Sequence, residues 1–184
     1  MLMKMRGTGV RSAIAVFGLL WAMSSGAITV TTDQPNLVDS NISTDGADLS
    51  SLAALLATPG SNGLALDELL YVVGQDLVDV SIDFAPSVTL IVLPDTLPTI
   101  LSTVNIDGGG TVTLDSQGDS NGLDIQGGDG GIIEGLTIKN SFDTGIRLSN
   151  AAVNYQILDC TIIEHNNEGI RISGPTSGGH TIRR

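Results

Sequence analysis

The sequence predicts a parallel β-solenoid with about 24 residues per coil, preceded by a small N-terminal cap that contains short helices. The first observation behind this prediction is a repeated segment of the form x-Gly-apolar-x-apolar. It occurs three times in the second half of the chain, and its glycines, Gly122, Gly145 and Gly169, lie 23 and 24 residues apart. Two further repeats share this period.

One of them is an apolar–Thr–apolar triplet, and the other is a single isoleucine. The triplets begin at Val112, Leu136 and Cys160, and the isoleucines are Ile133, Ile157 and Ile182. Both sets recur at the period of the glycines, to within one position. Three tracks with one period indicate a chain that winds as a coil and brings equivalent residues together.

Within each repeat apolar and polar residues alternate, which is typical of a β-strand with one buried face. Coils that stack at the ~4.8 Å spacing of neighbouring strands would place equivalent side chains directly above one another. We therefore expect two internal aliphatic ladders, Leu123–Ile146–Ile170 and Ile125–Leu148–Ile172. The turns between strands are rich in Gly, Asn, Asp and Ser, which tolerate left-handed backbone conformations.

Residues 28–87 are predicted to form the cap, and residues 88–184 the coils. Residues 28–32 alternate in the manner of a first strand. Residues 48–57 are rich in Leu and Ala after an acidic and serine-containing start, which predicts a capped helix that ends before Pro59. Residues 64–73 predict a second amphipathic helix. The cap would cover the unpaired strand groups that an open end of a solenoid exposes.

Residues 1–27 are predicted to be a signal peptide. Lys4, Arg6 and Arg11 precede an uncharged apolar stretch over residues 12–23, and four small residues follow it. An uncleaved anchor is the alternative, but twelve apolar residues are fewer than the ~20 that span a bilayer. We expect cleavage near Ala27, a secreted or cell-surface location, and no membrane span in the remaining chain.

Composition excludes several classes of partner and site. The formal net charge is −12, and after residue 27 there are 20 acidic and 5 basic residues, a net charge of −15. Such a surface is repelled by phosphate backbones and anionic lipids, so nucleic-acid partners are not expected. The single cysteine, Cys160, excludes an internal disulfide and a multi-cysteine zinc site.

Several segments resemble the right-handed parallel β-helix repeats of the secreted bacterial pectate-lyase-like superfamily. They are residues 121–125 (NGLDI), 133–140 (IEGLTIKN), 144–148 (TGIRL) and 159–172 (DCTIIEHNNEGIRI), with an entry segment over 93–100 and 104–110. The resemblance implies an all-β, right-handed parallel β-helix solenoid. It is specific for the fold and uninformative about activity, because the repeats describe walls of the coil rather than a catalytic site.

One outward column of the predicted coils consists of Asp124, Arg147 and Arg171. Guanidinium groups pair with carboxylates in bidentate fashion, so this column could bind an extracellular acidic polysaccharide. We favour the alternative that these are wall residues whose charges keep the coil soluble.

Asp115, Asp119, Asn121 and Asp124 form an oxygen-rich group that predicts a weak calcium site, because hard cations need six to eight oxygen ligands. Calcium is the one cofactor that the sequence suggests. No Ser–His–Asp, Walker or metal-binding histidine pattern occurs in the sequence, and His165 and His180 fall in predicted turns.

The predicted coils end within a strand at Ile182, so we expect further coils or another chain to continue the C-terminal edge. The sequence thus favours a fragment of a secreted or cell-surface β-helix with a structural, adhesive or glycan-interacting role and no identifiable catalytic site. The alternative is a polysaccharide lyase-like, carbohydrate-active enzyme whose catalytic coils lie beyond Arg184.

Overall fold

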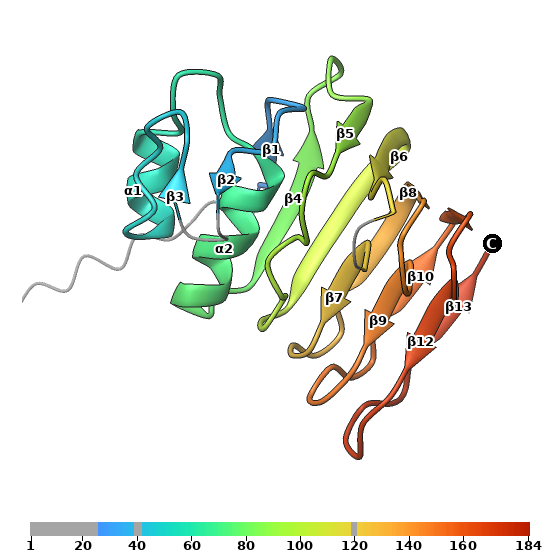
Figure 1. Ribbon diagram of the computed structural model, residues 1–184. Helices are drawn as coiled ribbons and strands as arrows, with labels where there is room; N and C mark the ends of the chain where they lie inside the picture. Colours follow the sequence, from blue (N-terminus) through green and yellow to red (C-terminus); the bar gives the residue numbers. More distant parts are fainter. Residues whose placement is uncertain (1–25, 39–41, 119–120) are drawn as a thin grey trace, which may run out of the picture.

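The structure, a computed structural model, describes residues 26–38, 42–118 and 121–184. These residues form a mostly β parallel solenoid of about four turns with coils of about 24 residues, and two short helices precede it. In Figure 1 the strands lie in ranks that follow the chain from the helical end to the C-terminus. The predicted fold class is thereby confirmed.

The larger sheet stacks strands of neighbouring coils, and β1 is added at its N-terminal edge. Its order is β1-β4-β6-β8-β10-β13, all pairs are parallel, and β5 and β11 pair with the far ends of β6 and β8. The bounds are β1 Ile28–Val30, β4 Val80–Phe84, β5 Leu90–Val92, β6 Val104–Asp115, β8 Ile132–Lys139, β10 Gln156–Leu158, β11 Thr161–Ile163 and β13 Thr181–Arg183. An isoleucine occupies one register position throughout: Ile28, Ile82, Ile106, Ile133, Ile157 and Ile182.

The second sheet has the order β12-β9-β7 and carries the glycine repeat. Its strands are β7 Leu123–Ile125, β9 Ile146–Leu148 and β12 Ile170–Ile172. Parallel pairing aligns the two predicted ladders, Leu123–Ile146–Ile170 and Ile125–Leu148–Ile172. Both ladders are therefore confirmed, and all their members on β7 and β9 are fully buried.

The repeated glycine allows successive coils to approach closely. A Cβ atom on Gly122 would lie 2.5 Å from the carbonyl oxygen of Gly145, and one on Gly145 would lie 2.7 Å from that of Gly169. The Gly122 N–H itself donates to the Thr144 carbonyl one coil away at 3.0 Å. Since any side chain here would push the coils apart, the sequence repeats glycine at this point.

The cap contains α1 (Leu52–Ala57), α2 (Leu66–Asp76) and an antiparallel pair, β2 (Leu37–Val38) and β3 (Ile42–Ser43). α1 begins later than predicted because Ser51 is its N-cap and accepts a hydrogen bond from the Ala54 N–H. α2 extends past residue 73 and ends where Leu77 adopts a left-handed conformation.

The larger sheet begins before the predicted boundary at residue 88. Both β1 and β4 belong to it, and Val80 and Ile82 pair in register with Val104 and Ile106, which follow one repeat later. The repeat therefore starts within residues 28–87, the predicted cap.

Among the described residues, the buried hydrophobic side chains are aliphatic with one exception. Tyr155 is fully buried, and its hydroxyl donates to the Ser102 carbonyl at 3.0 Å across the coil stack. Burial raises the pKa of Tyr155 to about 12, so this phenol stays protonated over the neutral range.

Within the part of the chain that the structure describes, neither helix has the length and apolar character needed to cross a bilayer. The predicted signal peptide falls almost entirely on residues 1–25, outside the described residues.

Candidate functional site

The predicted ligand column is a real register column, but its members bind one another. Asp124 pairs with Arg147, and Arg147 with Arg171, across β7, β9 and β12. Arg147 Nε donates to Asp124 Oδ1 at 2.8 Å, and its Nη2 donates to Oδ2 of the same carboxylate. Asp124 is only 6% exposed, because the Arg147 side chain covers it, and Gln126 Nε2 also donates to its Oδ2 at 2.9 Å. Its hydrogen bonds to Arg147 also raise the pKa of that guanidinium.

Arg171 is the more available of the two arginines. Its side chain is 46% exposed, and its Nη1 lies 3.8 Å from Asp143 Oδ2 and 4.0 Å from Glu168 Oε2. Such surface ion pairs contribute little stability. The column therefore offers one exposed arginine between two acidic groups, rather than two free arginines for a pair of uronate carboxylates.

Many other polar side chains on the outer walls bond to a residue one coil away. The donor–acceptor distances run from 2.6 to 3.3 Å, and the partners are 24 or 25 residues apart. The pairs are Asn105–Ser81, Asn140–Asp115, Asn150–Gln126, Asn154–Asp129, Asn167–Asp143 and Thr144–Glu168. The main use of these groups is to bind coil to coil.

The members of the predicted calcium group have separate surroundings. Asp115 makes an ion pair with Lys139 at 3.1 Å and accepts from the Asn140 amide at 2.8 Å. Asp124 is bound by Arg147, as described above, and Asn121 Oδ1 is buried without a hydrogen-bond partner. Asp119 lies outside the described residues. Among the described residues, no three His, Cys, Asp or Glu side chains are grouped to hold a metal ion.

Both histidines accept a hydrogen bond from the preceding coil. His165 Nδ1 accepts from the Ser141 N–H, and His180 Nδ1 accepts from the Tyr155 N–H, each at 3.1 Å. Burial lowers the pKa of both imidazoles. They are thus half-buried structural acceptors rather than solvated turn residues.

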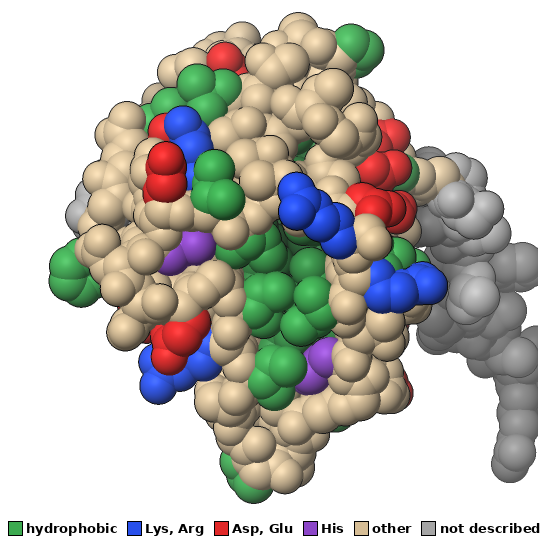
Figure 2. Space-filling view, turned by 90° about the vertical axis from the view of Figure 1, so that its right-hand side faces the viewer, with side chains coloured by type: hydrophobic (Ala, Val, Ile, Leu, Met, Phe, Trp, Pro, Cys, Tyr) green, Lys and Arg blue, Asp and Glu red, His purple; other side chains and the backbone are tan. Residues whose placement is uncertain are grey.

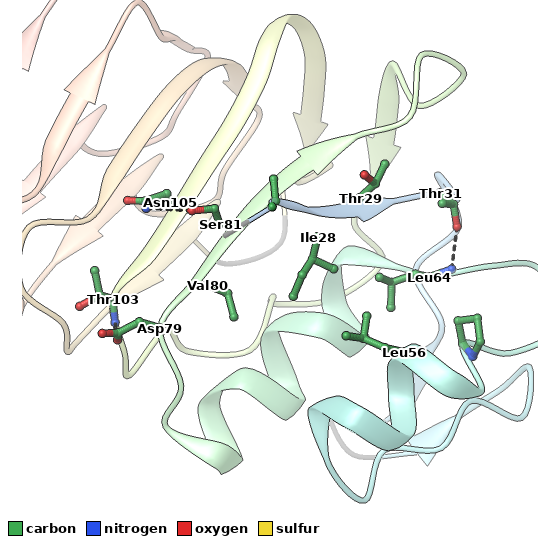
Figure 3. A pocket seen from close by; sticks show the side chains of 13 residues that line it. Ile28, Thr29, Thr31, Leu56, Leu64, Asp79, Val80, Ser81, Thr103 and Asn105 are labelled. Carbon is green, nitrogen blue, oxygen red and sulfur yellow. Dashed lines mark hydrogen bonds between the residues drawn. The ribbon is translucent and has the colours of Figure 1, made fainter. Parts of the chain in front are cut away.

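A cavity of about 810 Å³ beside β1 was not anticipated from the sequence. Figure 3 shows Ile28, Val80, Leu56 and Leu64 on one face of β1 and β4, and Thr29, Ser81 and Asn105 on the opposite face. No other strand of the described residues pairs with the edge of β1 that β4 leaves free. Ser81 and Asn105 are separated by one repeat, and this spacing is the signal that could have placed their side chains together.

The charge around this cavity restricts what it could bind. The sequence contains no Lys, Arg or His between residues 12 and 138, and Asp79 also lines the cavity. The lining therefore combines apolar side chains with hydroxyl, amide and carboxylate groups, which suits a neutral polyhydroxylated ligand better than an anionic one.

No protein-family model matches this chain, and no curated protein or solved structure shows significant similarity to it. The parallel solenoid therefore rests on the structure itself, and the pectate-lyase-like resemblance stays a prediction.

Proposed function

We propose that this chain is a structural or adhesive β-solenoid segment of a secreted or cell-surface protein. The observation that carries this proposal is the use of its outer polar side chains. Asn, Asp, Thr and Arg groups that could form a binding or catalytic surface are instead paired between neighbouring coils. Such pairing stiffens a stack of coils and leaves few free groups for acid–base chemistry.

The C-terminal end supports a role as one segment of a longer stack. In Figure 2 apolar side chains fill the centre of this end, and polar atoms and backbone surround them. Ile172 and Ile182, the last members of their ladders, are 48% and 51% exposed. Since such a face and its open strand edges favour further pairing, we propose that more coils or another chain cover it.

Glycan binding is the second candidate, and the cavity beside β1 favours it. Because Asp79 is the charged side chain among the described residues that line the cavity, the ligand would be a neutral oligosaccharide rather than a polyuronate. Asn105 Nδ2 donates to Ser81 Oγ at 3.1 Å, so the two polar groups are held together on one wall. Saturation-transfer NMR with cellohexaose tests this candidate. Ser81→Trp should abolish the transfer, and the exposed Ser87→Trp should keep it.

The main proposal is tested with polygalacturonate, with and without calcium. We expect neither retention of the protein on the polymer nor formation of unsaturated products. A lyase or a uronate-binding column would instead give product or retention that disappears in Arg147→Ala/Arg171→Ala and persists in the exposed Arg183→Ala control. That result would overturn the structural role.

A further inference from the structure

Among the described residues, Glu68 is the acidic side chain that the fold buries most completely. It lies in the first turn of α2, none of its surface is exposed, and neither carboxylate oxygen accepts a hydrogen bond from a donor in the described part of the chain. An ionised carboxylate in such a place costs several kcal/mol unless something neutralises it. The surroundings of Glu68 must therefore supply a neutralising group.

Among the residues that the structure describes, no cation is placed against Glu68 to neutralise it. The charged groups that face Glu68 are Asp45, from the loop between β3 and α1, and Asp67, its neighbour in α2. α1 has no titratable side chain, and the sequence has no basic residue from 12 to 138. Burial and these two acidic neighbours raise the pKa of Glu68 to about 7, although the nearby Ser43 and Asn36 side chains lower it in part.

Asp45 is surrounded by donors, unlike Glu68. Its two oxygens accept from Ser43 Oγ at 2.8 Å, Ala47 N at 3.2 Å, Asn62 N at 3.3 Å and Asn36 Nδ2 at 3.4 Å. Burial opposes ionisation of Asp45, but these donors and Glu68 outweigh it and lower the pKa of Asp45. Asp45 is thus the ionised member of the pair, and Glu68 is the protonated one.

This pair lies where three segments of the cap meet. The side-chain amides of Asn36 and Asn62 bind each other at 3.0 and 2.9 Å, and Asn36 also donates to Asp45. Asp67 Oδ2 accepts from the backbone N–H groups of Asn36 and Leu37 at 2.8 and 2.7 Å. The segment before β2, the loop before α1 and the loop before α2 are thereby fastened to the start of α2.

We propose that Glu68 and Asp45 share one proton as a carboxylic acid–carboxylate pair, and that the cap loosens when the proton leaves. A proton fits better than a metal ion because Asp45 already accepts four hydrogen bonds. The cap is therefore pH-sensitive. The protonated pair holds α2 and the loops together in acid, and loss of the proton releases them above neutrality.

The sign of the effect follows from the two protonation states. The pKa of Glu68 is higher in the folded chain than its ordinary value of 4.5. The contribution of Glu68 to folding stability is therefore at its maximum below about pH 4.5, and it is lost as the pH rises through about 7. One proton changes the unfolding equilibrium constant by at most about tenfold per pH unit.

Urea unfolding of the full chain between pH 4.5 and 8.5 tests the proposal. The unfolding constants of the wild type, Glu68→Gln and the exposed control Glu164→Gln are compared at each pH. The contribution of the other titrating groups cancels in the ratio of these constants. We expect the unfolding constant of the wild type, relative to Glu68→Gln, to rise between pH 5 and 7 by up to about tenfold per unit. The control should follow the wild type. A ratio that does not change with pH would overturn the proposal.

Infrared spectroscopy of the folded wild type gives a second readout that does not depend on the stability of a variant. A carboxylic acid C=O band should persist at pH 6 and disappear above pH 8, and its absence at pH 6 would contradict the proposal. Calcium chloride is added at pH 8 as a further arm. Stabilisation of the wild type but not of Glu68→Gln would show that a cation, not a proton, neutralises the pair.

Discussion

Arg147 holds the buried carboxylate of Asp124, one coil earlier in the solenoid, through two hydrogen bonds from its guanidinium group. The two residues occupy the same register position of β7 and β9. Among the described residues this pair is the most fully covered ion pair on the outer walls, and it shows how charges that could serve ligand binding are used within the fold.

Arg147→Ala should destabilise the chain by about 1–3 kcal/mol, because it removes two charge-assisted hydrogen bonds from the Asp124 carboxylate, which keeps only the Gln126 amide as a side-chain donor. Urea unfolding measures the change. The double variant Asp124→Ala/Arg147→Ala should be more stable than Arg147→Ala alone. Equal losses for Arg147→Ala and the exposed Arg183→Ala would mean that the pair adds nothing to stability.

The stacked glycines offer a matched series. Gly122→Ala and Gly145→Ala should each cost about 1–3 kcal/mol, since the new methyl group would meet backbone oxygen of the next coil. Gly169→Ala should be tolerated, because its nearest neighbour is a side-chain methyl of Ile162 at 3.4 Å. Thermal unfolding separates the three variants, and equal effects at all three positions would contradict the stacking.

The sequence was sufficient to predict the coil period, the aliphatic ladders and the outward column. Each of these depends on residues such as Leu123 and Ile146 that recur at a constant spacing, and a parallel coil converts constant spacing into contact. The low exposure of Asp124 could not be predicted, because alternation indicates only which wall a side chain faces, whereas the arginine that covers it comes from the next coil.

The Asp45–Glu68 pair and the cavity beside β1 could not be predicted in this way. The pair is formed by segments of the cap that do not repeat, and the cap also supplies Leu56 and Leu64 to the cavity, so no periodic signal relates Asp45 to Glu68 or Leu56 to Ile28. The resemblance to the pectate-lyase-like repeats also gave no information there, because it covers only the coils.

His165 and His180 should lower the folding stability of the chain in acid. The pKa of each folded imidazole is lowered, so its contribution is present above the ordinary pKa of 6.5 and is lost as the pH falls through the folded value. Protonation removes the Nδ1 acceptor used by Ser141 or Tyr155, at a cost of about 1 kcal/mol each. His165→Gln/His180→Gln should flatten the acid limb of the stability curve, and an unchanged limb would refute this role.

The exposed C-terminal face predicts self-association of the isolated chain. Light scattering should show a molar mass that rises with protein concentration, because apolar ladder ends and open strand edges are available for pairing. Ile172→Lys/Ile182→Lys should suppress the rise, and Leu90→Lys, at a distant exposed leucine on β5, should not. A wild type that remains monomeric at high concentration would argue against the proposed covering of this face.

Disulfide cross-linking tests most directly whether each repeat of the sequence forms one coil. In a Cys160→Ser background, cysteines replace Thr113 and Thr137, or Thr137 and Thr161, which are register partners on neighbouring coils. Both pairs should oxidise readily, because strands ~4.8 Å apart satisfy the Cα separation of a disulfide. The matched pair of Thr113 and Thr161, two coils apart, should not. Equal cross-linking of all three pairs, or of none, would contradict the solenoid.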